Sequence, residues 1–188
     1  MFNMHLGEIV FGGVGSGMYG MLFYVILTVF LAGLMVGRTP EFSNKKIEKF
    51  EVQMAGLAIL GPSITILFFT SLGLLLKQGT ATLNNSGPHG FSEVLYAFTS
   101  ATANNGSAFA GIGVNNDFYN YSLGLCMLIG RFVCLIPAVL IGGSLAFKKS
   151  VPESAGSFRT DTPVFVILLL FFILLIGGLT FLPALTMG

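Results

Sequence analysis

The segment TSATANNGSAFAGIG, residues 99–113, has residue types suited to holding a bare cation. A dehydrated cation needs oxygen ligands, and main-chain carbonyl groups can supply them. Small side chains let such carbonyl groups crowd around one axis, and glycine permits the backbone angles this requires. Asparagine tolerates left-handed conformations and braces tight turns through its side chain. The candidate ion-binding residues are therefore Asn104, Asn105, Gly106 and Ser107.

Other kinds of site find little support in the sequence. His5 and His89 stand alone, without the spacing of zinc ligands, and no catalytic triad, P-loop or aspartyl-phosphate motif is evident. Cys126 and Cys134, eight residues apart in one apolar segment, cannot bridge each other on a helix and are expected to be packing thiols. A net charge of +1 and the absence of a basic patch argue against nucleic-acid binding. We expect neither ATP hydrolysis nor covalent catalysis in this chain.

Composition determines the class of protein that must position the candidate site. The chain has 188 residues, of which 54% are hydrophobic and only 9% charged, whereas soluble domains carry about 25% charged residues. Four apolar segments approach or exceed the roughly 20 residues that cross a bilayer as a helix. The sequence therefore predicts an all-α polytopic membrane protein. The predicted spans are residues 18–37, 52–76, 119–147 and 163–185.

The basic residues predict how these spans are oriented. Seven of the nine Lys and Arg residues lie in the connectors 38–51 and 148–162. Since basic residues are enriched in cytoplasmic loops, both connectors are expected in the cytoplasm. Residues 78–117 and the C-terminus then face outward. The N-terminal MFNMHLGEIV has neither a basic region nor a cleavage site, so it is not expected to be a signal peptide.

The long outer connector contains a short helical pattern. Residues 91–101 are compatible with a helix of about 16 Å, which is too short to cross. Breaker residues precede it, and the small-residue stretch follows it. This order predicts a re-entrant pore loop over 91–113, whose helix would direct its partially negative C-terminal end at the candidate site. An ordinary outer hairpin rich in turn residues is the alternative.

A second glycine-rich stretch, FGGVGSGMYG, has three possible interpretations. Gly15, Gly17 and Gly20 match the G-x-G-x-x-G pattern, but a charge-free span follows where a dinucleotide-binding unit needs an amphipathic helix. Gly13 and Gly17 form a GxxxG pair suited to close helix packing. The glycines from Gly12 to Gly17 would also each destabilise a helix by about 1 kcal/mol, which predicts a break in it.

Three charged residues lie within or next to the predicted membrane spans. Glu8 precedes the glycine-rich stretch, and Arg131 lies in the middle of the third span. Inserting a charge at the centre of the bilayer costs about 2.5–3.5 kcal/mol, and such a charge faces a partner or a cavity. Arg131 could form a structural ion pair, with Glu8 as one possible partner, or act on the ion path. Arg38 lies at the inner membrane edge, where an anchoring role is the ordinary one.

Several long phrases carry a resemblance to a known family. GPHGFSEVLYAFTSATANNGSAFAG resembles the last pore loop of the potassium-translocating A subunit of the bacterial Kdp pump, and HLGEIVFGGVGSGMYGML, GLMVGRTPEF and GRF are similar to other parts of it. The similarity covers all 188 residues. The family belongs to a superfamily of potassium transporters with four membrane–pore–membrane repeats around one axis, and this chain resembles its C-terminal portion. The implied segments are 1–37 (second membrane helix of repeat three, broken at 12–17), 38–51 (cytoplasmic loop), 52–147 (repeat four, with pore loop 91–113), 148–162 (cytoplasmic loop) and 163–188 (final membrane helix).

The resemblance implies a function and a set of partners. The chain would bind and translocate K⁺ through carbonyl groups near Gly106, in the bacterial inner membrane, as part of an ATP-driven uptake pump. Arg131 would discourage direct passage to the cytoplasm, Glu8 would partner it or attract the ion sideways, and Arg38 would dock the ATP-hydrolysing subunit. The implied partners are the N-terminal part of the A subunit, a P-type ATPase B subunit, small C and F subunits, and the lipid bilayer. A Trk- or Ktr-type symporter pore and a non-conducting membrane scaffold are the alternatives.

Overall fold

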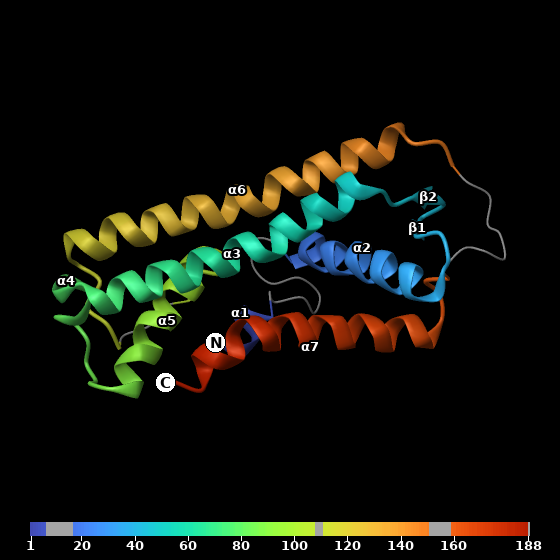
Figure 1. The fold of residues 1–188 in the computed structure, drawn as a ribbon. Coiled ribbons are helices and arrows are strands. Elements are labelled where there is room, and N and C mark those ends of the chain that lie inside the picture. The colour runs from blue at the N-terminus through green and yellow to red at the C-terminus, as the bar shows by residue number, and fades with distance from the viewer. Residues whose placement is uncertain (7–16, 108–110, 151–158, 188) are drawn as a thin grey trace.

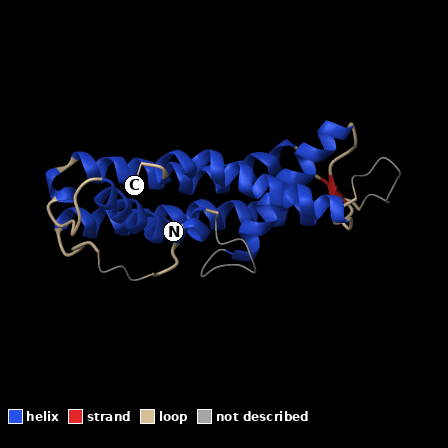
Figure 2. Ribbon diagram, turned by 90° about the horizontal axis from the view of Figure 1, so that it is seen from below, coloured by secondary structure: helices blue, strands red, loops and turns tan. Residues whose placement is uncertain are grey.

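The computed structural model describes residues 1–6, 17–107, 111–150 and 159–187. These residues form an elongated helical bundle in which α3 and α6 lie side by side and α2 packs on α3 and on α7 (Figure 1). A small β-hairpin lies at one end of the bundle (Figure 2), and α4 and α5 lie toward the other. The elements are α1 (Phe2–His5), α2 (Gly17–Val36), β1 (Glu41–Phe42), β2 (Lys45–Lys46), α3 (Lys49–Leu75), α4 (Lys77–Thr80), α5 (Pro88–Ala103), α6 (Asp117–Phe147) and α7 (Pro163–Leu185).

Four helices are long and apolar enough to cross a membrane, as the sequence predicts. They are Met18–Val36, Lys49–Leu75, Asp117–Phe147 and Pro163–Leu185. Pro62 lies inside α3 without ending it, which is common in membrane helices because neighbouring groups satisfy the freed carbonyl. The predicted break at 12–17 lies outside the described residues, except for Gly17, where α2 begins.

The connector predicted as a loop over 38–51 contains more structure than expected. β1 and β2 pair antiparallel, with Glu41 opposite Lys46, and the turn between them holds Ser43 and Asn44 at φ of 53° and 58°. Two consecutive positive φ values are the mark of a type I′ hairpin turn. α3 then begins at Lys49, so residues 49–51 are helical. The capping box of Glu48 and Glu51 explains this earlier start.

The short helix of the outer connector is also longer than predicted. α5 covers 16 residues, from Pro88 to Ala103, rather than 91–101. The prediction treated the proline and glycines before residue 91 as breakers, and this was wrong. Pro88 occupies the first helical turn, where its missing N–H is not needed, and Gly87 precedes it at φ 70°. Gly90 is required because a Cβ there would overlap the main-chain oxygen of Asn85.

The connector enters and leaves the bundle at one place. Leu83, before α5, forms an isolated antiparallel bridge with Ile112, after it. The N–H of Gly113 donates to the oxygen of Thr82 at 3.0 Å. The Glu93 carboxylate, buried on α5, accepts from the N–H of Asn84 at 3.1 Å. The chain therefore runs into the bundle along α5, and the segment after the turn lies again beside the segment before α5.

A buried ion pair joins α3 and α6 at the hairpin end. The Glu51 side chain has no exposed surface, and its Oε2 lies 2.8 Å from the Lys148 Nζ. Lys148 also lies 3.1 Å from Glu48 Oε2 and donates to the oxygen of Lys46. Burial alone would lower the pKa of Lys148, but the hydrogen bonds and charges of Glu51 and Glu48 outweigh it and raise the pKa. The sequence marked Lys148 only as a basic loop residue.

Candidate functional site

The candidate site begins where α5 ends, near the middle of the bundle (Figure 1). At about 24 Å, a 16-residue helix is shorter than the roughly 30 Å hydrocarbon core of a membrane. Its last turn packs on α6 at Gly130, where a Cβ would overlap the main-chain oxygen of Thr102. Gly130 lies near the middle of the 31-residue α6. The turn after α5 is therefore held at mid-span.

The backbone of this turn has the conformations that its residue types favour. Asn104 ends α5 in the left-handed region at φ 55° and ψ 31°. Gly106 follows at φ 70°, and its Cα faces open space, because a Cβ there would meet nothing within 4 Å. Positive φ values at Asn104 and Gly106, with one residue between them, reverse the chain tightly. They also allow carbonyl groups to turn away from the helix.

The side chain of Asn104 ties the turn to a second helix. Its Nδ2 donates to the oxygen of Thr102 at 3.1 Å and to the oxygen of Met127, on α6, at 3.0 Å. The side chain is therefore a brace in this structure rather than an ion ligand. This is the bracing role that the sequence predicts for asparagine.

Asn105 and Ser107 take part in a hydrogen-bonded network with two hydroxyl groups of α5. Asn105 Oδ1 accepts from the N–H of Ser107 at 2.8 Å and from Ser100 Oγ at 2.9 Å. Ser107 Oγ lies 2.7 Å from Ser100 Oγ and accepts from the Tyr96 hydroxyl at 3.0 Å. Ser100 Oγ also lies 3.5 Å from the main-chain oxygen of Ser107, to which it can donate. The network therefore ties both the side chains and the backbone of the turn to α5.

Tyr96 and Ser100 were not among the candidates from the sequence. They stand four residues apart, so they share one face of α5, and this spacing was the available signal. Ser100 is buried and Tyr96 half-buried. A pair of hydroxyl side chains on one face of the helix is evidence that this face meets polar atoms, but the spacing alone does not identify them.

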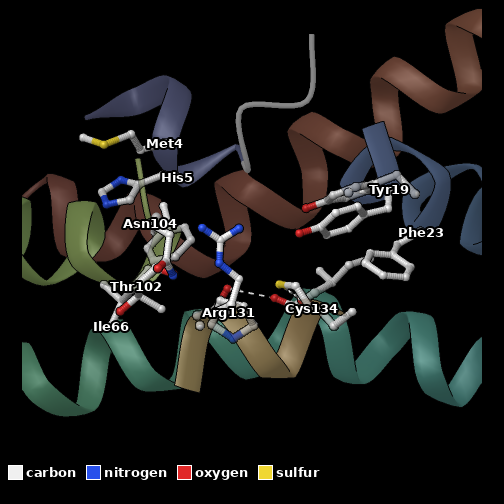
Figure 3. Close-up of a pocket in the computed structure, with 18 residues that line it drawn as sticks. Met4, His5, Tyr19, Phe23, Ile66, Thr102, Asn104, Arg131 and Cys134 are labelled. Atoms are coloured by element: carbon white, nitrogen blue, oxygen red, sulfur yellow. Dashed lines mark hydrogen bonds between the residues drawn. The ribbon is translucent and has the colours of Figure 1, made fainter. Parts of the chain in front are cut away.

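A cavity of about 100 Å³ lies below the turn. The Arg131 side chain projects from α6 into this space, between His5 and Asn104 on one side and Tyr19 and Phe23 on the other (Figure 3). The structure thus brings Arg131 close to the last turn of α5. Of the other predicted path residues, Glu8, Gly12, Gly13 and Gly15 lie outside the described residues.

His5 has a structural role that its isolated position in the sequence did not predict. It is buried, and its ring stacks on Phe181 of α7 with centroids 4.2 Å apart. The Thr99 hydroxyl donates to the oxygen of Leu95 at 2.6 Å, so His5 Nε2 is the donor in its 2.9 Å bond to Thr99 Oγ1. His5 therefore joins α1, α5 and α7.

Arg38 lies far from this site, beyond the other end of α2. Its N–H donates to the oxygen of Gly33 at 2.8 Å, and the N–H of Gly37, at φ 70°, donates to the oxygen of Leu34. These two bonds form a Schellman motif, which ends α2. The Arg38 side chain is exposed next to the hairpin, consistent with the predicted position at a membrane edge.

Together, the four spans and the short helix that ends among them define a multi-pass α-helical membrane protein with a braced turn at mid-span. The model of the Potassium-transporting ATPase A subunit family matches residues 1–188, so the chain belongs to that family. A relative from Mesorhizobium japonicum is 57% identical over 188 residues, which are 100% of this chain and 33% of the relative. Another, from Herpetosiphon aurantiacus, is 58% identical over 100% of this chain and 32% of the relative. Both are potassium-binding subunits of potassium-transporting ATPases. The chain spans about a third of the length of these curated relatives.

Proposed function

We propose that this chain supplies one of four walls of a potassium-binding site in an ATP-driven uptake pump. α5 is the pore helix, and residues 104–107 are the filter segment. The observation that carries the proposal is the turn at Asn104 and Gly106, which stands at mid-span with its side-chain amides used as braces. The main-chain carbonyl groups of the segment are the ligands it would offer to a dehydrated K⁺.

Electrostatics and topology support the same assignment. The C-terminal end of α5 carries a partial negative charge that favours a cation at the turn. The connector enters and leaves at one level, as a re-entrant loop must. Irregular backbone at this depth is tolerated only where it lines water or is buried in protein.

Arg131 is proposed to control where the ion goes after the filter. Its guanidinium projects into the cavity next to the last turn of α5 (Figure 3). A fixed positive charge there would repel a cation that moves straight toward the cytoplasm. The interruption at Gly12 to Gly17, a contribution of Glu8 to the path, and docking by Arg38 stay predictions from the sequence.

The remaining parts of the pump lie on other chains or segments. Three more filter walls would come from the N-terminal part of the A subunit, and ATP hydrolysis from a P-type B subunit, with small C and F subunits completing the complex in the bacterial inner membrane. The family match over residues 1–188 favours this assignment over a Trk- or Ktr-type pore.

The test is Gly106→Ala in the complete complex. A Cβ at φ 70° has open space but costs about 1–2 kcal/mol of backbone strain, so K⁺ affinity should fall about tenfold. The measurement is the K⁺ and Rb⁺ dependence of ATPase activity and uptake, and discrimination against Rb⁺ should relax. Gly124→Ala on α6, also in open space and without a positive φ, is the matched control. Unchanged K⁺ dependence in Gly106→Ala would overturn the filter assignment.

A further inference from the structure

The hydrogen-bond contacts behind the filter segment fit a chain of donors that runs in one direction. The Ser107 main-chain N–H must donate, so the amide atom that faces it at 2.8 Å is the Asn105 oxygen. Ser100 Oγ, 2.9 Å from the same oxygen, donates to it, and its longer 3.5 Å contact with the main-chain oxygen of Ser107 shares the same hydrogen. Each hydroxyl has a single hydrogen. Ser107 Oγ therefore donates to Ser100 Oγ, and the Tyr96 hydroxyl donates to Ser107 Oγ.

All the hydroxyl hydrogens of the chain thus point toward Asn105. Hydrogen bonds ordered in one direction polarise and strengthen one another, and buried examples hold a unique conformation. Ser100 is 7% exposed, so water competes little for its hydroxyl. Tyr96 and Ser100 both belong to helix α5.

The network acts on the peptide planes on either side of Gly106. The bond from the Ser107 N–H to the Asn105 side chain closes the turn over Gly106. Ser100 and Tyr96 fix the positions of the two side chains that close it. The directions of the carbonyl groups of Asn105 and Gly106 follow from these planes.

We propose that Tyr96 and Ser100 are positioning residues for the potassium site. They do not touch the ion. They hold the carbonyl groups of the filter segment in the geometry that distinguishes K⁺ from ions of similar size. The inference rests on the proposed function, and it adds two residues of α5 to the determinants of affinity and selectivity.

The experiment removes single hydroxyl groups in the complete complex. Tyr96→Phe deletes only the oxygen, and Ser100→Ala breaks the chain at its centre. Tyr96→Phe loses one bond of the network and Ser100→Ala loses two, so the K⁺ concentration for half-maximal ATPase activity should rise about 3- to 10-fold, more in Ser100→Ala, at nearly unchanged maximal rate. The preference for K⁺ over Rb⁺ should fall in both. Ser100→Thr keeps the hydroxyl and should restore affinity relative to Ser100→Ala.

The controls separate positioning from general damage. Tyr121→Phe removes a hydroxyl from an 80% exposed tyrosine on α6 and should leave K⁺ affinity unchanged. Loss of assembly or maximal rate with unchanged K⁺ affinity and selectivity in Tyr96→Phe and Ser100→Ala would overturn the proposal. Should Gly106→Ala change K⁺ dependence while neither hydroxyl variant does, the positioning role fails and the filter assignment stands. If none of the three changes it, the filter assignment itself fails.

Discussion

Gly130 packs directly on the main-chain oxygen of Thr102, so that a methyl group at position 130 would overlap this oxygen. The contact joins the middle of α6 to the last turn of α5. It determines how deeply the short helix enters the bundle. The absence of a side chain at Gly130 is therefore part of what positions the proposed filter segment, although Gly130 itself offers no ligand.

Gly130→Ala should displace the end of α5 and weaken K⁺ binding. The clash involves main chain, which cannot rotate away, so we expect a loss of about 1–3 kcal/mol in stability. Thermal unfolding of the purified complex and the K⁺ dependence of its ATPase activity measure the two effects. Gly142→Ala, elsewhere on α6 with nothing within 4 Å, should change neither. If Gly130→Ala has the stability of the wild type, the two helices can move apart without cost, and the contact with Thr102 does not set the depth of α5.

Asn104 should tolerate glycine better than alanine. Both substitutions remove the bonds to the oxygen atoms of Thr102 and Met127, but only glycine adopts φ 55° without strain. Asn104→Ala should therefore be less stable than Asn104→Gly by about 1–2 kcal/mol. Thermal unfolding of the two variants in the complete complex compares them. Equal losses would mean that the side-chain bonds, and not the left-handed conformation, decide the residue at this position.

Lys148→Met should leave the buried Glu51 carboxylate without its cation. We expect a loss of roughly 2 kcal/mol, less than for a fully buried pair because the Lys148 side chain is 19% exposed. Adding Glu51→Gln should recover part of it. Lys149→Met, which removes an exposed neighbouring charge, is the matched control. If the unfolding temperature of Lys148→Met equals that of Lys149→Met, the ion pair does not hold α3 to α6.

The same pair predicts a pH dependence. The pKa of Lys148 is higher in the folded state than its ordinary value. Its contribution is therefore complete below the pKa of the unfolded state and is lost as pH rises through the folded pKa. Stability from this pair should be constant between about pH 6 and 9 and should fall only above about pH 10. In Lys148→Met this alkaline component should be absent from a pH series of unfolding temperatures.

Much of the fold follows from the sequence because it depends on local properties. The four spans were predicted to within a few residues, since apolar length is counted along one segment. The turn at Asn104 and Gly106 was expected because few residue types accept positive φ. The start of α5 was missed: Pro88 stops a helix in its interior and favours one in its first turn, so its effect depends on position.

The partners of the polar side chains could not be predicted in the same way. Tyr96 and Ser107 are eleven residues apart and meet only because the chain reverses at Gly106. Glu51 and Ser144 are 93 apart, and they meet because α3 and α6 pack side by side. Helices such as α3 and α7 are apolar on all sides, so no hydrophobic stripe indicates which face turns inward.

The sequence by itself determined that this is a helical membrane protein with a small-residue turn suited to a cation, because length, apolarity and backbone freedom belong to single segments. Only the tertiary structure decided that the Asn104 side chain reaches Met127 of α6, that Gly130 limits the depth of α5, and that Arg131 projects into the cavity below the turn. Each of these depends on how helices far apart in the chain rotate and approach one another, and packing sets that geometry.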